Sequence, residues 1–219
     1  MAVVPLSDAS RSPTGFPITT VLIIAANAVC FALELSGGDA FVARWSVTPA
    51  QISGGHHLST LFTAMYMHAS WSHIIGNMVF LWAFGPVVED AMNPVSYFIF
   101  YTLGGIVAML CQVAIDPHST MASLGASGAI AAVMGAFIVT YPQDRIKSLL
   151  ILGWYVRITF IPAAVLIGMW FLIQLLSAGS IVGHQHIQQG GVAYMAHIGG
   201  MVFGAIFGRI FEGPRQLFK

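Results

Sequence analysis

The sequence predicts an all-α polytopic membrane protein that folds as one bundle of six transmembrane helices. Of its 219 residues, 57% are hydrophobic and 7% are charged, whereas a soluble globular domain carries about 25% charged residues. Such a chain cannot bury all of its apolar surface inside itself, so we expect a lipid bilayer to surround it. The net charge is zero, and nothing indicates nucleic acid as a partner. Cys30 and Cys111 lie in separate apolar runs and indicate neither a disulfide nor a metal site.

Six apolar segments are long enough to approach the roughly 20 residues of helix that a bilayer core about 30 Å thick requires. They cover residues 16–35, 73–89, 94–115, 127–141, 159–178 and 192–211. Pro17, Pro94 and Pro162 lie near the starts of their spans, where a missing N–H costs little. The sequence therefore predicts one core domain over residues 16–211, between cytoplasmic tails at 1–15 and 212–219.

The basic residues predict the orientation, because Lys and Arg near span ends are retained on the cytoplasmic side. With six spans, one side holds both termini and Arg11, Arg145, Lys147, Arg157, Arg209, Arg215 and Lys219. The other side holds Arg44 alone among the basic residues. We expect both termini in the cytoplasm and the protein in a bacterial inner (plasma) membrane. The outer loop at 36–72 has mixed character, which predicts short helices embedded in the membrane interface.

Four polar side chains from three spans are predicted at one depth in the membrane. The fourth span has fifteen residues before Pro142, or about 22 Å of helix, so its first residue, Ser127, lies below the outer surface. His197, Asn77 and His73 lie at similar heights above the inner ends of their own spans. Each residue alone is explained by packing or by interhelical hydrogen bonding, but their coincidence favours a functional site.

Small residues predict that the fourth and sixth spans pack closely. Ala196, Gly200, Gly204 and Gly208 recur every four residues on the sixth span, and Gly128, Ala132 and Ala136 do so on the fourth. Such faces let two helix backbones approach. A serine hydroxyl and an imidazole need about 2.6 to 3.2 Å between heavy atoms for proton transfer, and helices in close contact can hold that distance.

The chain resembles the rhomboid intramembrane serine proteases. The matching segments are HASWSHIIGN at 68–77, GASG at 125–128 and AHIGGMVFG at 196–204, in this order on spans two, four and six. The similarity runs across the six-span core and leaves out the first fifteen residues. It implies a six-transmembrane-helix rhomboid-like bundle whose first outer loop is embedded in the membrane.

The resemblance also implies a mechanism, in which Ser127 attacks the scissile carbonyl and His197 accepts its proton, as a dyad. It assigns the oxyanion hole to the side chains of His73 and Asn77 and to the backbone N–H of Ser127. No Asp or Glu of the spans lies at the depth of His197. No cofactor is expected.

The resemblance further implies that the substrate is a transmembrane polypeptide that enters sideways from the lipid. The fifth span is then the gate, with Trp170 and Phe171 as its bulky residues, although a lipid-facing position explains each aromatic residue nearly as well. Water is expected to arrive through the outer loops that hold His118 and residues 183–191. The chain departs from the family pattern at two places. Some relatives carry an aromatic residue that stacks on the catalytic histidine at the position of Ala131. Ser59-Thr60 stand where a Trp-Arg pair is often found.

Two other functions are compatible with parts of the sequence. One is a catalytically inactive rhomboid-like protein that only binds membrane helices. The other is a metal transporter or metalloprotease, suggested by eight histidines that include His56-His57 and His184-x-His186. The intramembrane zinc pattern H-E-x-x-H is absent, so we expect no metal partner.

Overall fold

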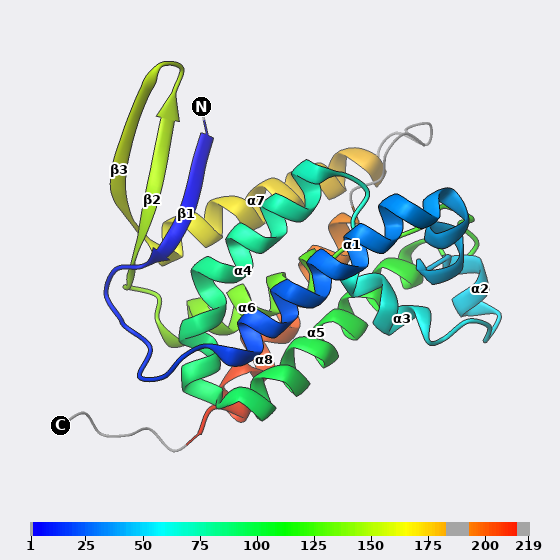
Figure 1. Cartoon of the computed structure of the whole chain (residues 1–219), viewed down its shortest axis with the longest axis horizontal. Coiled ribbons are helices and arrows are strands. Elements are labelled where there is room, and N and C mark those ends of the chain that lie inside the picture. The colour runs from blue at the N-terminus through cyan, green and yellow to red at the C-terminus, as the bar shows by residue number, and fades with distance from the viewer. Residues whose placement is uncertain (1, 183–192, 214–219) are drawn as a thin grey trace.

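The computed structural model describes residues 2–182 and 193–213, and it places most of them in a bundle of helices with a small sheet at one end (Figure 1). The longer helices are α1 (Ile18–Trp45), α4 (Trp71–Met92), α5 (Pro94–Ile115), α6 (Ser127–Thr140), α7 (Ala163–Val182) and α8 (Tyr194–Phe211). The loop after α1 holds α2 (Pro49–Ser53), α3 (Thr60–Thr63) and a short 3-10 helix, η1 (Ala64–Tyr66). The strands are β1 (Ala2–Asp8), β2 (Arg145–Leu152) and β3 (Tyr155–Pro162).

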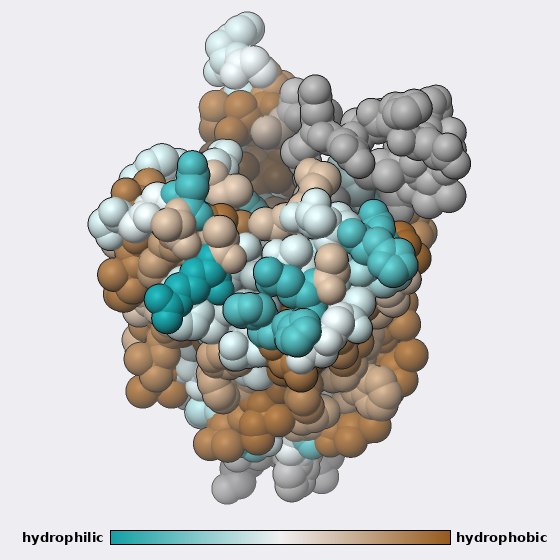
Figure 2. Space-filling view, turned by 90° about the vertical axis from the view of Figure 1, so that its right-hand side faces the viewer, coloured by the Kyte–Doolittle hydropathy of each residue, from teal (hydrophilic) through white to brown (hydrophobic). Residues whose placement is uncertain are grey.

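The helices are those of a polytopic membrane protein. Among the described residues, α1, α4, α5 and α8 are long and apolar enough to cross a membrane, and Ser127–Thr140 and Ala163–Leu176 are shorter apolar helices. Figure 2 views the end of the bundle that holds the loop after α1: hydrophilic residues gather on this end, and hydrophobic residues cover the flanks. A mostly helical, membrane-spanning architecture is thus confirmed.

Helix α6 lies at the centre of the bundle. Every residue from Gly128 to Phe137 is buried, as expected for a helix that is apolar on all sides. The surrounding helices instead expose large apolar side chains outward, such as Leu22 on α1 and Ile206 on α8. Helix α6 is therefore surrounded by protein and not by lipid over most of its length.

A buried carboxylate links two of the surrounding helices. Glu89 on α4 accepts hydrogen bonds from the backbone N–H groups of Thr19 and Thr20 and from the Thr20 hydroxyl. The first N–H groups of a helix have no acceptor within the helix, and a negative charge there is favoured by the helix dipole. Glu89 thus caps α1 and holds its start against the end of α4.

Two predicted span boundaries are wrong. Helix α1 continues to Trp45 instead of ending near residue 35, with a break at Gly38, whose φ of 58° is a left-handed conformation that glycine adopts readily. Helix α7 begins at Ala163 instead of residue 159, because residues 159–162 belong to β3.

The sheet was not predicted, and it corrects the all-α class. Its order is β1-β2-β3, with both neighbouring pairs antiparallel. Strands β2 and β3 form a hairpin around Gly153, and β1, from the segment expected to be an N-terminal tail, pairs along β2 from Ala2–Ile151 to Asp8–Ile146. The segments are rich in Val, Ile and Leu, which suit paired strands. The sheet lies beside α4 and the start of α7 (Figure 1).

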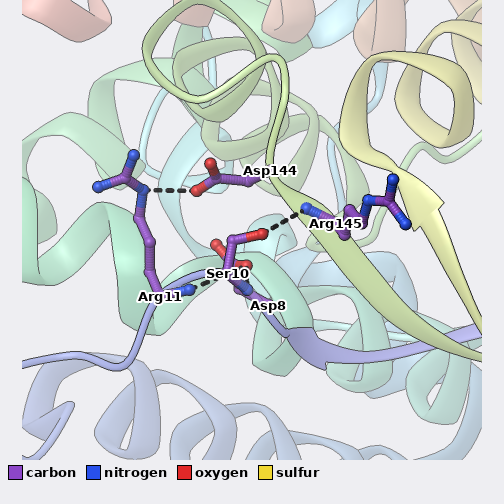
Figure 3. Close-up of polar contacts among 5 residues, drawn as sticks. All are labelled: Asp8, Ser10, Arg11, Asp144 and Arg145. Atoms are coloured by element: carbon purple, nitrogen blue, oxygen red, sulfur yellow. Dashed lines mark hydrogen bonds and ion pairs between the residues drawn. The ribbon is translucent and has the colours of Figure 1, made fainter.

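Polar contacts attach the N-terminal segment to the connection between α6 and β2 (Figure 3). The Arg11 guanidinium lies 2.5 Å from the Asp144 carboxylate. The backbone N–H of Ser10 donates to Asp8 (2.7 Å), and the backbone N–H of Arg145 donates to the Ser10 hydroxyl (2.8 Å). Burial, with repulsion from the Asp144 carboxylate, raises the pKa of Asp8 to about 6. The C-terminal end of β1 is therefore held by an ion pair and hydrogen bonds.

Candidate active site

The small-residue faces of α6 and α8 are in direct contact, as predicted. A β-carbon placed on Gly204 would overlap the carbonyl oxygen of Ala132, and one placed on Gly200 would overlap that of Gly128. In the next turn, a β-carbon on Gly208 would lie 2.6 Å from the β-carbon of Ala136. No larger residue fits at these positions without separating the two helices.

This close packing brings together Ser127, the first residue of α6, and His197, in the first turns of α8. Nε2 of His197 lies 2.7 Å from Oγ of Ser127. The two residues are 70 positions apart in the sequence, and His197 is 7% exposed. This geometry lets a neutral imidazole accept the hydroxyl proton.

The other ring nitrogen of His197 contacts a residue that the sequence analysis missed. Nδ1 of His197 lies 2.8 Å from Oε1 of Gln174 on α7, and Gln174 is 8% exposed. One turn earlier on α7, the Trp170 ring lies 5.4 Å from the His197 ring, measured between centroids. At Ala131, where some relatives carry an aromatic residue, the side chain is fully buried in α6. Besides the Ser127 hydroxyl on α6, the His197 ring thus contacts Gln174 and Trp170, which both lie on α7.

His73 and Asn77 lie beside Ser127 at the start of α4. The His73 ring packs against Gly125, where a β-carbon would lie 2.9 Å from Nε2 of His73 and 3.7 Å from the Ser127 hydroxyl oxygen. Gly125 has a φ of 131°, a conformation that side chains disfavour. Glycine at this position therefore allows the imidazole to approach the serine.

Asn77 has a hydrogen-bonding partner that the sequence analysis did not single out. Its side-chain nitrogen lies 2.9 Å from Nε2 of His68, and the His68 ring packs edge-on against the His73 ring. The backbone N–H of His68 donates to the buried carboxylate of Glu34 on α1. A chain of contacts thus runs from α1 through His68 to both side chains expected in the oxyanion hole.

A cavity of about 190 Å³ opens onto the Ser127 side chain. Its lining comes from α4, α6 and α7 and includes Ser72, His73, Asn77, Ser127 and Trp170. All five of these side chains carry hydrogen-bonding groups, and the remaining lining residues are apolar. The cavity can therefore hold a polar group, such as a peptide carbonyl, next to the serine.

The two residues expected at the gate lie in different places. Trp170 lines the cavity, whereas Phe171 is not among its lining residues and packs, partly buried, against the main hydrophobic core. His118, expected on the water route, is exposed. The remainder of that route, residues 183–191, lies outside the described residues.

The structure also places the histidines that suggested a metal. His56 and His57 are exposed in the loop between α2 and α3. Over residues 2–182 and 193–213, no group of three or more His, Cys, Asp or Glu side chains is arranged to hold a metal ion. His184 and His186 fall in the part of the chain that the structure does not describe.

Comparison with known proteins identifies the family. The model of the Rhomboid domain matches residues 55–213, which include α3 to α8 and with them Ser127, His197, His73, Asn77 and Gln174. The mitochondrial presenilin-associated rhomboid-like protein of Rattus norvegicus is 28% identical over 208 residues, which cover 91% of this chain and 48% of that protein.

Two further relatives show the same level of similarity. The chloroplastic rhomboid-like protein 11 of Arabidopsis thaliana is 28% identical over 66% of this chain and 49% of its own length. The rhomboid protease GluP of Bacillus subtilis is 28% identical over 67% of this chain and 29% of its own length. The chain thus spans about half the length, or less, of these relatives. The match of the domain model to most of the sequence shows that the chain belongs to the rhomboid family.

Proposed function

We propose that the chain is an intramembrane serine endopeptidase that cleaves transmembrane segments of single-pass membrane proteins. The observation that carries this proposal is the distance of 2.7 Å between Oγ of Ser127 and Nε2 of His197, beside a cavity that polar and apolar side chains line together. A protein that only binds membrane helices does not need a nucleophile in contact with a base. The name of one relative, a rhomboid protease, agrees with this activity.

In the proposed reaction, His197 removes the hydroxyl proton as the Ser127 oxygen forms a bond to the scissile carbonyl carbon. The tetrahedral intermediate collapses, the C–N bond breaks, and the imidazolium gives its proton to the leaving amine. Water then attacks the acyl-enzyme with His197 again as the base, and the serine is restored. All proton transfers use Nε2, the nitrogen that lies next to the serine.

The proposed oxyanion hole surrounds the position that the carbonyl oxygen would occupy. Ser127 is the first residue of α6, and the N–H groups in a first helical turn have no acceptor within the helix. The side chains of His73 and Asn77 line the same cavity and can add two donors. Removing one such donor costs about 3 kcal/mol of transition-state stabilisation in a serine protease.

The proposed path of the substrate lies between α4 and α7, which both contribute residues to the lining of the cavity. Trp170 narrows the cavity on the α7 side and must move to admit a peptide, so we assign the gate to Trp170, with Phe171 as its neighbour. An amide within a regular helix is protected from attack, so a cut site with glycine or proline is favoured.

We also propose the orientation in the membrane. Helices α6 and α7, although short, count as spans in this proposal, which gives six in all. Arg11, Arg145 and Arg209 then lie on one side, near the ends of α6 and α8, and positively charged residues are retained in the cytoplasm. Both termini are placed there, with the protein in a bacterial inner membrane.

The test is cleavage of a single-pass reporter protein by the purified chain in liposomes. We expect Ser127→Ala and His197→Ala each to abolish cleavage while the thermal unfolding midpoint in detergent is retained. Ser36→Ala, which makes the same change at an exposed position, serves as the matched control and is expected to keep full activity. Full activity of either dyad variant would refute the proposal.

A further inference from the structure

We infer that Gln174 is a positioning residue of the catalytic histidine, and that it makes the alignment of His197 depend on the position of α7. The inference rests on the proposed function and deepens it. No Asp or Glu of the predicted spans lies at the depth of His197. Gln174 takes the place that the acidic residue of a Ser-His-Asp triad would occupy. Its Oε1 lies 2.8 Å from Nδ1 of His197, on the side of the ring opposite the serine.

The contact selects one tautomer of the histidine. A neutral imidazole carries its proton on Nδ1 or on Nε2, and only the nitrogen without a proton can accept one from Ser127. A carboxamide oxygen only accepts hydrogen bonds, so Oε1 of Gln174 holds the proton on Nδ1. Nε2 then presents its lone pair to the serine hydroxyl, 2.7 Å away.

Both side chains of this contact are buried. Gln174 is 8% exposed and His197 is 7% exposed, so water does not readily substitute for either partner. A buried amide or imidazole without a partner is costly, and each of these groups satisfies the other. The imidazolium that forms during proton transfer donates through Nδ1, and the amide oxygen stabilises it in place.

The contact also connects catalysis to the helix of the proposed gate. Trp170 and Gln174 are one turn apart and share a helix face, and both meet His197. The opposite side of α7 exposes Met169, Ile173 and Leu176, which suits contact with lipid. An outward movement of α7 that widens the cavity would therefore withdraw Gln174 from Nδ1, and its return would align the base again.

The experiment compares the wild type with Gln174→Leu and Gln174→Glu. The leucine variant keeps similar volume and loses the acceptor, so we expect kcat to fall about 10- to 100-fold, which corresponds to about 1.4 to 2.8 kcal/mol, with KM less affected. The glutamate variant retains an acceptor and is expected to recover activity. Because a carboxylate favours the imidazolium, the acidic limb of the pH profile of kcat for Gln174→Glu should move to higher pH.

A second readout is independent of cleavage. Nitrogen-15 NMR of histidine-labelled protein distinguishes a ring nitrogen that carries a proton from one that does not, and the His197 signals are assigned by their loss in His197→Ala. We expect the proton on Nδ1 in the wild type and a mixture of tautomers in Gln174→Leu. Gln112→Leu on α5 makes the same change in a helix that does not line the cavity and should resemble the wild type.

The outcomes separate this inference from the proposed function. If Gln174→Leu keeps the kcat, pH profile and tautomer of the wild type while Ser127→Ala is inactive, the role of Gln174 is refuted. The proposed protease function is then retained. If Gln174→Leu fails to fold, the pH profile of Gln174→Glu decides, since an unchanged acidic limb would overturn the inference. If the wild type does not cleave, the proposed function fails, whereas the tautomer measurement still tests the contact.

Discussion

Replacement of Gly204 by alanine should lower the proposed protease activity, although Gly204 does not line the cavity beside Ser127. The new β-carbon would overlap the carbonyl oxygen of Ala132 across the contact between α8 and α6. A carbon and a carbonyl oxygen need about 3.3 Å, so the two backbones must move apart by about 1 Å or more. Overpacking of this kind also costs typically about 1 to 3 kcal/mol of stability.

The displacement reaches the dyad because His197 lies two turns before Gly204 on the same helix. Its Nε2 is 2.7 Å from the Ser127 hydroxyl oxygen, and an increase of about 1 Å exceeds the reach of about 3.2 Å that proton transfer requires. A misplacement of this size can reduce the rate about 100-fold. We therefore expect kcat/KM for a reporter transmembrane protein in liposomes to fall about 100-fold.

Gly168→Ala is the matched control, since a β-carbon on Gly168 of α7 meets nothing within 4 Å. It is expected to cleave normally and to be as stable as the wild type or up to about 1 kcal/mol more stable, because alanine favours helix. Thermal unfolding in detergent checks that both variants are folded. A Gly204→Ala protein that is folded and has the kcat/KM of the wild type would refute the proposed link between helix packing and the dyad.

Three further predictions concern Asp8 at the end of β1 and the proposed oxyanion hole. The pKa of Asp8 rises from 3.8 to about 6 on folding, so the folded protein binds more protons and its stability falls as the pH rises from about 4 to 6. Asp8→Asn should remove this fall and raise the unfolding midpoint at pH 7, and a pH dependence of thermal unfolding like that of the wild type would contradict this. Asn77→Ala should lower kcat about 10-fold, which is less than the effect of Ser127→Ala, because water can replace one donor. A kcat as low as that of Ser127→Ala would contradict this replacement by water. Gly125→Ala should also lower kcat, because its β-carbon would lie 2.9 Å from Nε2 of His73, whereas Gly15→Ala, with open space around it, should not.

Composition and motif order predicted the membrane class and the pairing of α6 with α8, because both depend on local properties. Apolar length predicts a span, and small residues every four positions predict a close helix contact. The start of α6 at Ser127 was also predicted, because the short apolar run before Pro142 limits where the helix can begin.

The sheet was missed because its strands resemble other structures in the sequence. β1 is a short segment near the N-terminus that becomes a strand only by pairing with β2, more than 130 residues away. The end of β3 is as apolar as the helix that follows it, so residues 159–162 were assigned to the span. Pairing of distant strands is a tertiary property that hydropathy does not report.

Gln174 could have been found by the reasoning that selected the other polar residues. It is a polar side chain within the predicted fifth span, and such residues by default face the bundle interior and mark function. The partner of Asn77, His68, could not be identified in this way, because it lies in the irregular segment before α4.

The most direct test of the central claim is chemical labelling of Ser127. A fluorophosphonate reacts with a serine only where a base activates the hydroxyl, so mass spectrometry of the labelled protein reports the contact with His197. We predict a single adduct on the peptide that contains Ser127 in the wild type, and none in Ser127→Ala or His197→Ala. A folded wild-type protein that cleaves the reporter but carries no adduct at Ser127, or labelling of equal rate in His197→Ala, would contradict the account.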